Sequence, residues 1–330
     1  MAKKAIEVVC DNRQKFVDKI IERLEEGHGI WEKDWKPIDL SPQNPVSGVK
    51  YKGINRFMLA FESIEKGYDD PRWVTMKHAK EKGYKLKEGE EGVICEKWLW
   101  EKQVPVMDEE TGKQKVDEQG NKVFAVEELS SPYCNYFKLY NAKQFENFPE
   151  LEKPNLMERW NDKELLDVAD KFIASSECPI SEVNKNINAY LPRTDEIYLV
   201  PREQFKSAES FLGTVLHEMS HSTGHEKRLN RELTIFKDSK NEKNDKERYA
   251  MEELVAELST TFIEADLGIN LDFQSEDHLA YMGSWIDTLK KEPNILYKVC
   301  KSANMSSELI MDNYNLELEK NRDYMEDQAI

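Results

Sequence analysis

The stretch His217-Glu218-Met219-Ser220-His221 places two imidazoles and one carboxylate at the H-E-x-x-H spacing of hydrolytic zinc centres. Apolar residues recur every three or four positions over 205–219, which predicts a helix that carries the motif. On a helix, His221 lies one turn beyond His217 and about 40° round the axis, so both rings can point at one ion. Glu218 lies to one side, where it is better placed to take a proton from an attacking water than to bind the metal. The motif therefore predicts a metallopeptidase with Glu218 as the general base.

A catalytic zinc site usually takes three protein ligands, so the motif needs one more donor. His225 is the nearest histidine. The segment 221–224 matches the start of the metzincin pattern, but that pattern requires a histidine at position 227, which is Lys227. The sequence therefore excludes the metzincin type, and His225 is interpreted as a surface histidine or a hydrogen-bond partner of a ligand.

The segment 247–267 predicts a second helix, which ends at Gly268 and carries Glu253 and Glu257 on one face. Two glutamates four residues apart on a helix can have different roles: one binds the metal, and the other accepts a hydrogen bond from a ligating histidine. By analogy with thermolysin-like enzymes, the first acid is the ligand, which selects Glu253 and leaves Glu257 as a hydrogen-bond partner of a ligand or an alternative ligand. The competing interpretation is that Glu252, Glu253 and Glu257 form a solvated acidic face. The expected ion is Zn²⁺, although such sites also accept Mn²⁺, Co²⁺ or Ni²⁺.

The net charge of −17 argues against a broad nucleic-acid-binding surface, but the charge is unevenly distributed. Residues 1–150 hold 25 Lys and Arg against 28 Asp and Glu, whereas 151–330 hold 22 against 36. Within the first half, 72–87 has a local excess of positive charge. This segment is compatible with an anion-binding face, and a solvated helix flank is the alternative.

The start of the chain lacks the apolar core of a signal peptide, and no run approaches 18 apolar residues. The five cysteines are scattered and show no C-x-x-C spacing, which favours reduced thiols over a disulfide framework. We expect a cytoplasmic protein with no membrane partner.

Periodicity and turn residues predict an α+β protein with two domains. Further helices are expected over 8–26, 55–65, 76–82, 164–175, 279–289 and 294–303, followed by a charged tail, and strands over 71–75, 93–104, 133–139, 189–191 and 196–200. A strongly charged insert with turn signals separates the strands 93–104 and 133–139, and it predicts a projecting hairpin or a mobile loop. Pro149 and Pro154 mark a linker over 149–158, so the expected domains are 1–148 and 159–330.

Several segments together resemble the ArdC-type antirestriction proteins of plasmids, phages and integrative elements. The matching segments are 31–35, N-P-V-S-G-V-K-Y-K-G-I-N at 44–55, W-V-T at 73–75, 87–92, 195–197, 222–224, 228–231 and Y-A-M-E-E-L-V-A-E-L at 249–258. The resemblance covers most of residues 8–305. It implies an N-terminal α+β domain that binds single-stranded DNA and a C-terminal zincin-like domain of the gluzincin type. It also implies that the protein protects incoming mobile-element DNA in a bacterial host cell.

Single strands are bound by exposed aromatic faces that stack on bases, together with positive charge for the phosphates. The first half interleaves both kinds of residue, and the candidate DNA contacts are Trp35, Lys50, Tyr51, Lys52, Arg56, Arg72, Trp73, Lys77 and Lys85. Burial in the core is the alternative for each aromatic ring. The nearly neutral charge of this half predicts micromolar-class affinity with a strong salt dependence.

Three functions are compatible with the sequence. The chain is a metallopeptidase with an unidentified protein substrate, a DNA-binding shield whose metal domain is a scaffold, or a peptidase tethered to single-stranded DNA.

Overall fold

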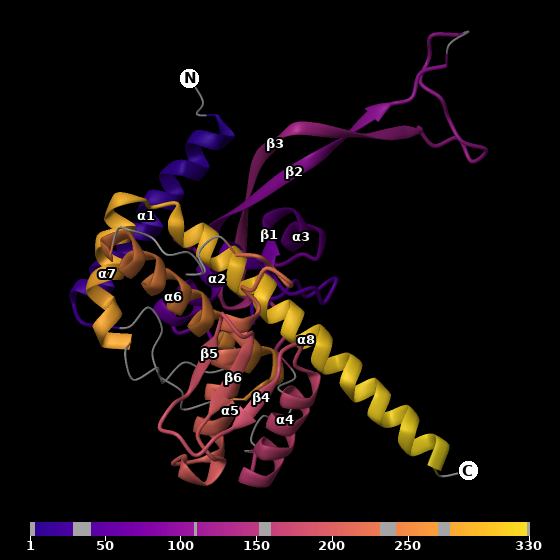
Figure 1. Cartoon of the computed structure of the whole chain (residues 1–330). Helices are drawn as coiled ribbons and strands as arrows, with labels where there is room; N and C mark the ends of the chain where they lie inside the picture. Colours follow the sequence, from indigo (N-terminus) through magenta and orange to yellow (C-terminus); the bar gives the residue numbers. More distant parts are fainter. Residues whose placement is uncertain are drawn as a thin grey trace.

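The computed structural model describes residues 4–28, 41–108, 111–151, 160–231, 242–269 and 278–328, and it shows an α+β fold (Figure 1). Among these residues, no helix is long and apolar enough to cross a membrane. In chain order the elements are α1 (Ala5–Glu25), α2 (Gly53–Lys66), β1 (Trp73–Thr75), α3 (Met76–Glu81), β2 (Val93–Pro105), β3 (Phe124–Asn141), η1 (Ala142–Gln144), α4 (Asp162–Ser175), β4 (Ile180–Glu182), β5 (Ala189–Leu191), β6 (Glu196–Leu199), η2 (Arg202–Gln204), α5 (Ala208–Ser222), α6 (Glu242–Leu267), α7 (His278–Lys291) and α8 (Ile295–Gln328).

The first sheet is antiparallel, with strand order β1-β3-β2. Its root packs around a small buried cluster of Leu59, Trp73, Cys95 and Leu139. Beyond the root, β2 and β3 continue as a two-stranded hairpin that projects far from the rest of the molecule (Figure 1). The charged insert between the two predicted strands is therefore a projecting hairpin in its described residues, and β3 begins nine residues before the predicted strand, at 124 instead of 133.

The second sheet has strand order β4-β6-β5, with β4 parallel and β5 antiparallel to the central strand β6. Its apolar side packs with α4 and α5, which contribute Phe172, Phe211 and Leu216 to one core. The sequence did not predict β4, which is only three residues long. Because β5 is an edge strand next to α5, its backbone lies beside the helix that carries the H-E-x-x-H motif.

The largest core joins the two ends of the chain. Helices α1 and α2 supply residues such as Phe16 and Phe57, and helices α6, α7 and α8 supply residues such as Leu254, Trp285 and Val299. The contact is polar as well as apolar, because Arg56 of α2 is buried and donates to Asp266 of α6 at 3.1 Å. The first helices are therefore held against the second half of the chain.

The helix expected over 294–303 does not end there, because the charged segment that follows is part of the same helix. Helix α8 continues to Gln328 and forms the long rod that leaves the body in Figure 1. Tyr314 stacks on Phe172 of α4 with ring centroids 4.1 Å apart, and Ile310 is buried in the same core. The tail is helical because these apolar side chains give it one face that packs on α4.

A candidate metal centre between two helices

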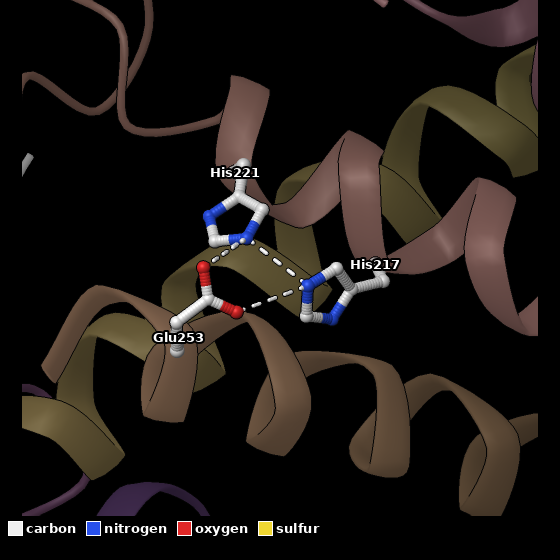
Figure 2. A group of neighbouring side chains, drawn as sticks. All are labelled: His217, His221 and Glu253. Carbon is white, nitrogen blue, oxygen red and sulfur yellow. Dashed lines mark hydrogen bonds and ion pairs between the residues drawn. The ribbon is translucent and has the colours of Figure 1, made fainter. Parts of the chain in front are cut away.

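Helix α5 begins at Ser207, whose side chain caps the helix by accepting from the backbone N–H of Ser210. From there to Ser222 the helix is buried almost throughout, between the second sheet and α6. His217 and His221 lie one turn apart on the side that faces α6, and Glu253 of α6 points back at them (Figure 2). The helix predicted from the motif is therefore present, and it packs against the predicted glutamate helix.

His217, His221 and Glu253 form a compact group of possible ligands. Nε2 of His217 lies 3.1 Å from Nε2 of His221. The Glu253 carboxylate spans both rings, with Oε2 3.4 Å from Nε2 of His217 and Oε1 3.5 Å from Nε2 of His221. A tetrahedral ion with ligand bonds of about 2.0–2.2 Å requires ligand atoms about 3.3–3.6 Å apart. The spacing of these three donors therefore fits one divalent ion, with the two imidazoles slightly closer than the ideal.

Glu218 is buried beside this group and is held by the edge strand. Its Oε2 accepts the backbone N–H of Tyr190 in β5 at 2.7 Å. The carboxylate has a second oxygen, Oε1, which can receive a proton. Tyr190 is fixed in turn, because its hydroxyl donates to Asp195 at 3.0 Å and Arg228 donates to the same carboxylate. Sequence reasoning missed this support, since a backbone donor leaves no signal in side-chain pattern.

The hydrogen-bond partner behind His221 is Glu252, which the sequence did not suggest for this role. Oε1 of Glu252 lies 3.5 Å from Nδ1 of His221, on the far side of the ring from the ligand group. Arg231 is buried and donates to both carboxylate oxygens of Glu252. Carboxylates in this position orient a ligating histidine and raise its basicity. Glu252 and Arg231 therefore orient His221 through Nδ1, the ring nitrogen that faces away from the ligand group. The position of Glu252 next to Glu253 in the sequence did not indicate this role.

The structure contradicts the interpretation of the three glutamates as a solvated face. Glu252, Glu253 and Glu257 are at most 5% exposed. Glu257 lies one turn beyond Glu253 and does not belong to the group that could hold an ion. His225 is also buried, with Nδ1 3.7 Å from Asp195, so it is not the surface histidine that one interpretation offered.

The electrostatics of the group follow from burial and from its own ion pairs. Burial acts to lower the pKa of His221, but hydrogen bonds with Glu252 and Glu253 raise it to about 10. Burial acts to raise the pKa of Glu253, but the two histidines hold it far below its usual range. Histidine must be deprotonated to bind a metal, so a proton and an ion compete for the same nitrogen.

A chain of buried hydroxyls ties α5 to α6 and α8 beneath the site. Ser220 donates to Ser259 at 2.9 Å, and Ser259 donates to Ser306 at 2.9 Å. Thr223 joins the same chain through Ser306 at 2.8 Å. These bonds fix the helix that carries both histidines relative to the helix that carries Glu253.

Burial corrects two of the candidate DNA contacts, Trp73 and Arg56. Trp73 has no exposed surface, and Arg56 is buried in its pair with Asp266, so neither can touch a nucleic acid in this structure. Tyr51 is half-buried and its hydroxyl donates to the backbone of Trp73. These side chains face inward because they pack against residues that lie far away in the sequence.

The remaining basic candidates differ in their exposure. Lys50 pairs with Asp266 at 2.6 Å, Lys52 pairs with Glu308, and Arg72 pairs with the buried Asp70 at 2.6 Å. Lys77 and Lys85 are exposed, which agrees with either a phosphate contact or a solvated flank. Trp35 lies outside the described residues.

Comparison with known protein families matches both halves of the chain. Residues 10–138 match the N-terminal domain of the anti-restriction factor ArdC, and residues 167–302 match a zincin-like metallopeptidase domain. The second match contains every member of the candidate metal group. The two-domain α+β organisation predicted from the sequence is therefore confirmed.

Two curated relatives are DNA primases TraC of Escherichia coli, each 32% identical over about 90% of this chain. The chain spans only 27% and 19% of their length. An uncharacterized protein y4eC of Sinorhizobium fredii is 24% identical, and the match covers 89% of both chains.

Two solved structures resemble the chain along nearly their whole length. Both are of the antirestriction protein ArdC from plasmid R388, one free of metal and one with Mn(II) bound. The metal-free structure gives a TM-score of 0.69 at 31% identity and covers 92% of this chain and 97% of the relative. The Mn(II)-bound structure gives 0.68 at 29% identity, with the same coverage. The chain belongs to the ArdC-type antirestriction family, and its second half is the zincin-like domain of that family.

Proposed function

We propose that the chain is an antirestriction protein whose zincin-like domain binds a divalent metal ion and hydrolyses peptide bonds. The observation that carries the proposal is the three-donor group of His217, His221 and Glu253, with Glu218 fixed beside it. Zinc is the default ion for two histidines and a glutamate. The Mn(II)-bound relative supports a site that also accepts other divalent ions.

An ion bound there would supply Lewis acidity toward a peptide carbonyl and toward an attacking water. The chain itself supplies the proton transfer. Glu218 has one oxygen held by the Tyr190 N–H, so the carboxylate keeps a fixed orientation while the other oxygen takes a proton. The same carboxylic acid can then give that proton to the leaving amine.

The first test replaces the base and leaves the ligands in place. In Glu218→Gln we expect hydrolysis of labelled casein to fall about 10²–10⁴-fold. Metal content, measured by elemental analysis, should stay equal to that of the wild type. Glu203→Gln, an exposed acid on the same half, is the matched control and should keep full activity. Hydrolysis that persists in Glu218→Gln would assign the base to another residue.

We further propose that the N-terminal domain binds single-stranded DNA and that this binding protects incoming mobile-element DNA in the cytoplasm of a bacterial host. The match to the N-terminal domain of an anti-restriction factor supports this function. A peptidase tethered to single-stranded DNA would act on proteins bound there, whereas a shield would only cover the DNA.

A restriction-protection assay with Glu218→Gln separates these two versions. Loss of protection together with loss of hydrolysis would support the tethered peptidase. Protection that survives in Glu218→Gln would support the shield with a metal domain that acts as a scaffold. Metal-loaded wild-type protein that cleaves no protein, with or without single-stranded DNA, would exclude the peptidase.

A further inference from the structure

The hairpin formed by β2 and β3 exposes aromatic side chains that an isolated molecule would normally bury. Trp100 is 61% exposed and Tyr133 is 58% exposed, and Val126 nearby is 63% exposed. Exposed apolar groups that gather in one place mark a binding surface more often than a plain surface. The projecting hairpin (Figure 1) is therefore a candidate binding arm that the site described above does not use.

An irregularity in the strand pairing shapes this surface. Leu99 pairs with Tyr133 and Glu101 pairs with Glu128, so residues 129–132 of β3 lie opposite Trp100 alone. A bulge of this kind bends the strand and redirects side chains. At the bulge the hairpin has an open groove of about 910 Å³, lined by Lys97, Trp98, Trp100, Lys102 and Tyr133 among others.

The root of the hairpin is rigidly attached to the body. Arg13 of α1 donates to Glu96, and the same carboxylate accepts the indole N–H of Trp98 at 2.7 Å. Asn55 of α2 bonds both the backbone N–H and the carbonyl of Glu96, at 3.0 Å and 2.8 Å. A fixed root holds the groove in one orientation, which lowers the entropy lost on binding.

The groove combines aromatic rings with two lysines and one acid, Glu101, and this excess of lysine favours a nucleic acid over a protein. The centre of a protein interface is depleted of lysine, whereas here Lys97 and Lys102 lie among the rings. Lys102 pairs with Glu127 at 3.1 Å, but both side chains are exposed, and exposed ion pairs are weak because water screens them. A phosphate can therefore replace that partner.

We propose that this groove is the single-strand contact site of the N-terminal domain. Trp100 and Tyr133 stack on bases, which suits any base because each has a flat π-face. Lys97 and Lys102 contact phosphates. The inference rests on the proposed DNA-binding function and moves its site from the buried residues around Trp73 to the exposed arm.

The test measures binding of the full-length protein to a fluorescent 20-nucleotide oligothymidylate by anisotropy, at low and moderate salt. Each of Trp100→Ala and Tyr133→Ala should weaken binding about 5- to 150-fold, and Trp100→Phe should restore most of the loss. Lys97→Gln should weaken binding mainly at low salt and make the salt dependence less steep. Trp160→Ala removes a partly exposed ring from the other half of the chain and should bind as the wild type does.

The outcomes separate this inference from the function on which it rests. If wild-type protein binds and Trp100→Ala and Tyr133→Ala bind equally well, the strand contacts another surface, and the inference is wrong while the function stands. If wild-type protein fails to bind the oligonucleotide even at low salt, both are wrong. Thermal melts of each variant should match the wild type, because the substituted rings make little contact with the core.

Discussion

Helix α6 and the β2–β3 hairpin both depart from the ordinary placement of side chains, but in opposite directions. Helix α6 buries charge, since Glu252, Glu253 and Glu257 are almost inaccessible to solvent. The hairpin exposes Trp100 and Tyr133. Buried carboxylates need partners inside the chain or a bound ion, whereas exposed rings gain nothing until a ligand covers them. Substitutions in α6 should therefore change stability or metal binding, and substitutions in the hairpin should change ligand binding alone.

The largest effect is expected where α6 meets the first half of the chain. Asp266→Asn removes the charge that compensates the buried Arg56, and because Asp266 is itself partly exposed, we expect the lower end of the cost of breaking a buried pair, about 3 kcal/mol of unfolding free energy. Urea unfolding should show this loss. Asp312→Asn changes an exposed acid on α8 and should stay within about 0.5 kcal/mol of the wild type. A stable Asp266→Asn protein would show that Arg56 is compensated by other groups, such as the backbone carbonyl of Phe262 and the charge of Glu308.

The next effect concerns metal affinity. Glu252→Gln removes the charge that holds His221 from behind and pairs with Arg231, so metal affinity should fall about 10–100-fold. Competition with a chromogenic chelator measures the change. Glu226→Gln, an exposed acid close to the motif, should leave affinity unaltered. Equal affinities in both variants would show that His221 is oriented by α5 alone.

Asp195 is a buried acid outside α6, and it should make the unfolding free energy depend on pH. Burial acts to raise the pKa of Asp195, but hydrogen bonds from Arg228 and Tyr190 lower it to about 2. The carboxylate therefore stabilises the fold above about pH 4, and this contribution of about 2 kcal/mol is lost as the pH falls toward 2. With a chelator present to remove bound metal, the unfolding free energy of Asp195→Asn should be lower than that of the wild type at neutral pH. Between about pH 4 and 3 it should fall less than that of the wild type. Parallel curves for the two proteins would contradict this.

The smallest effect is expected in the hairpin. Trp100→Ser should change the unfolding free energy by less than about 0.5 kcal/mol, because the ring is mostly in water. Chemical unfolding monitored by circular dichroism is the appropriate measurement. A loss above about 2 kcal/mol would mean that the ring packs within the chain, and the contrast with α6 would fail.

Sequence predicted the parts of the site that are local. The two histidines lie four residues apart on one helix, so their proximity follows from helix geometry, and the periodicity of 205–219 located that helix. Glu253 was selected only by analogy with thermolysin-like enzymes, and the structure places it beside both rings. Local spacing was therefore enough to predict the pair of histidines, whereas the third ligand could be predicted only from a known zinc-enzyme architecture.

Sequence failed where burial depends on distant residues. Trp73 and Arg56 look like DNA contacts when their neighbours are lysines, but Arg56 meets Asp266, which lies 210 residues further along the chain. The orienting role of Glu252 depends on Arg231, which no periodicity connects to it. The hairpin was foreseen as one of two alternatives, but the groove at Trp100 arises from the offset in strand pairing, which a sequence pattern does not encode.

The core that joins α1 and α2 to α6, α7 and α8 has a consequence for synthesis on the ribosome. Phe16 and Phe57 emerge early and contact each other, but the part of their core that α6, α7 and α8 supply begins only near Ala250. At about 5–20 residues per second, the early helices wait roughly 10–40 s before their partners exist. During that interval their apolar faces are exposed and prone to aggregation. The nascent chain should therefore depend on a chaperone until α6, α7 and α8 have been synthesised.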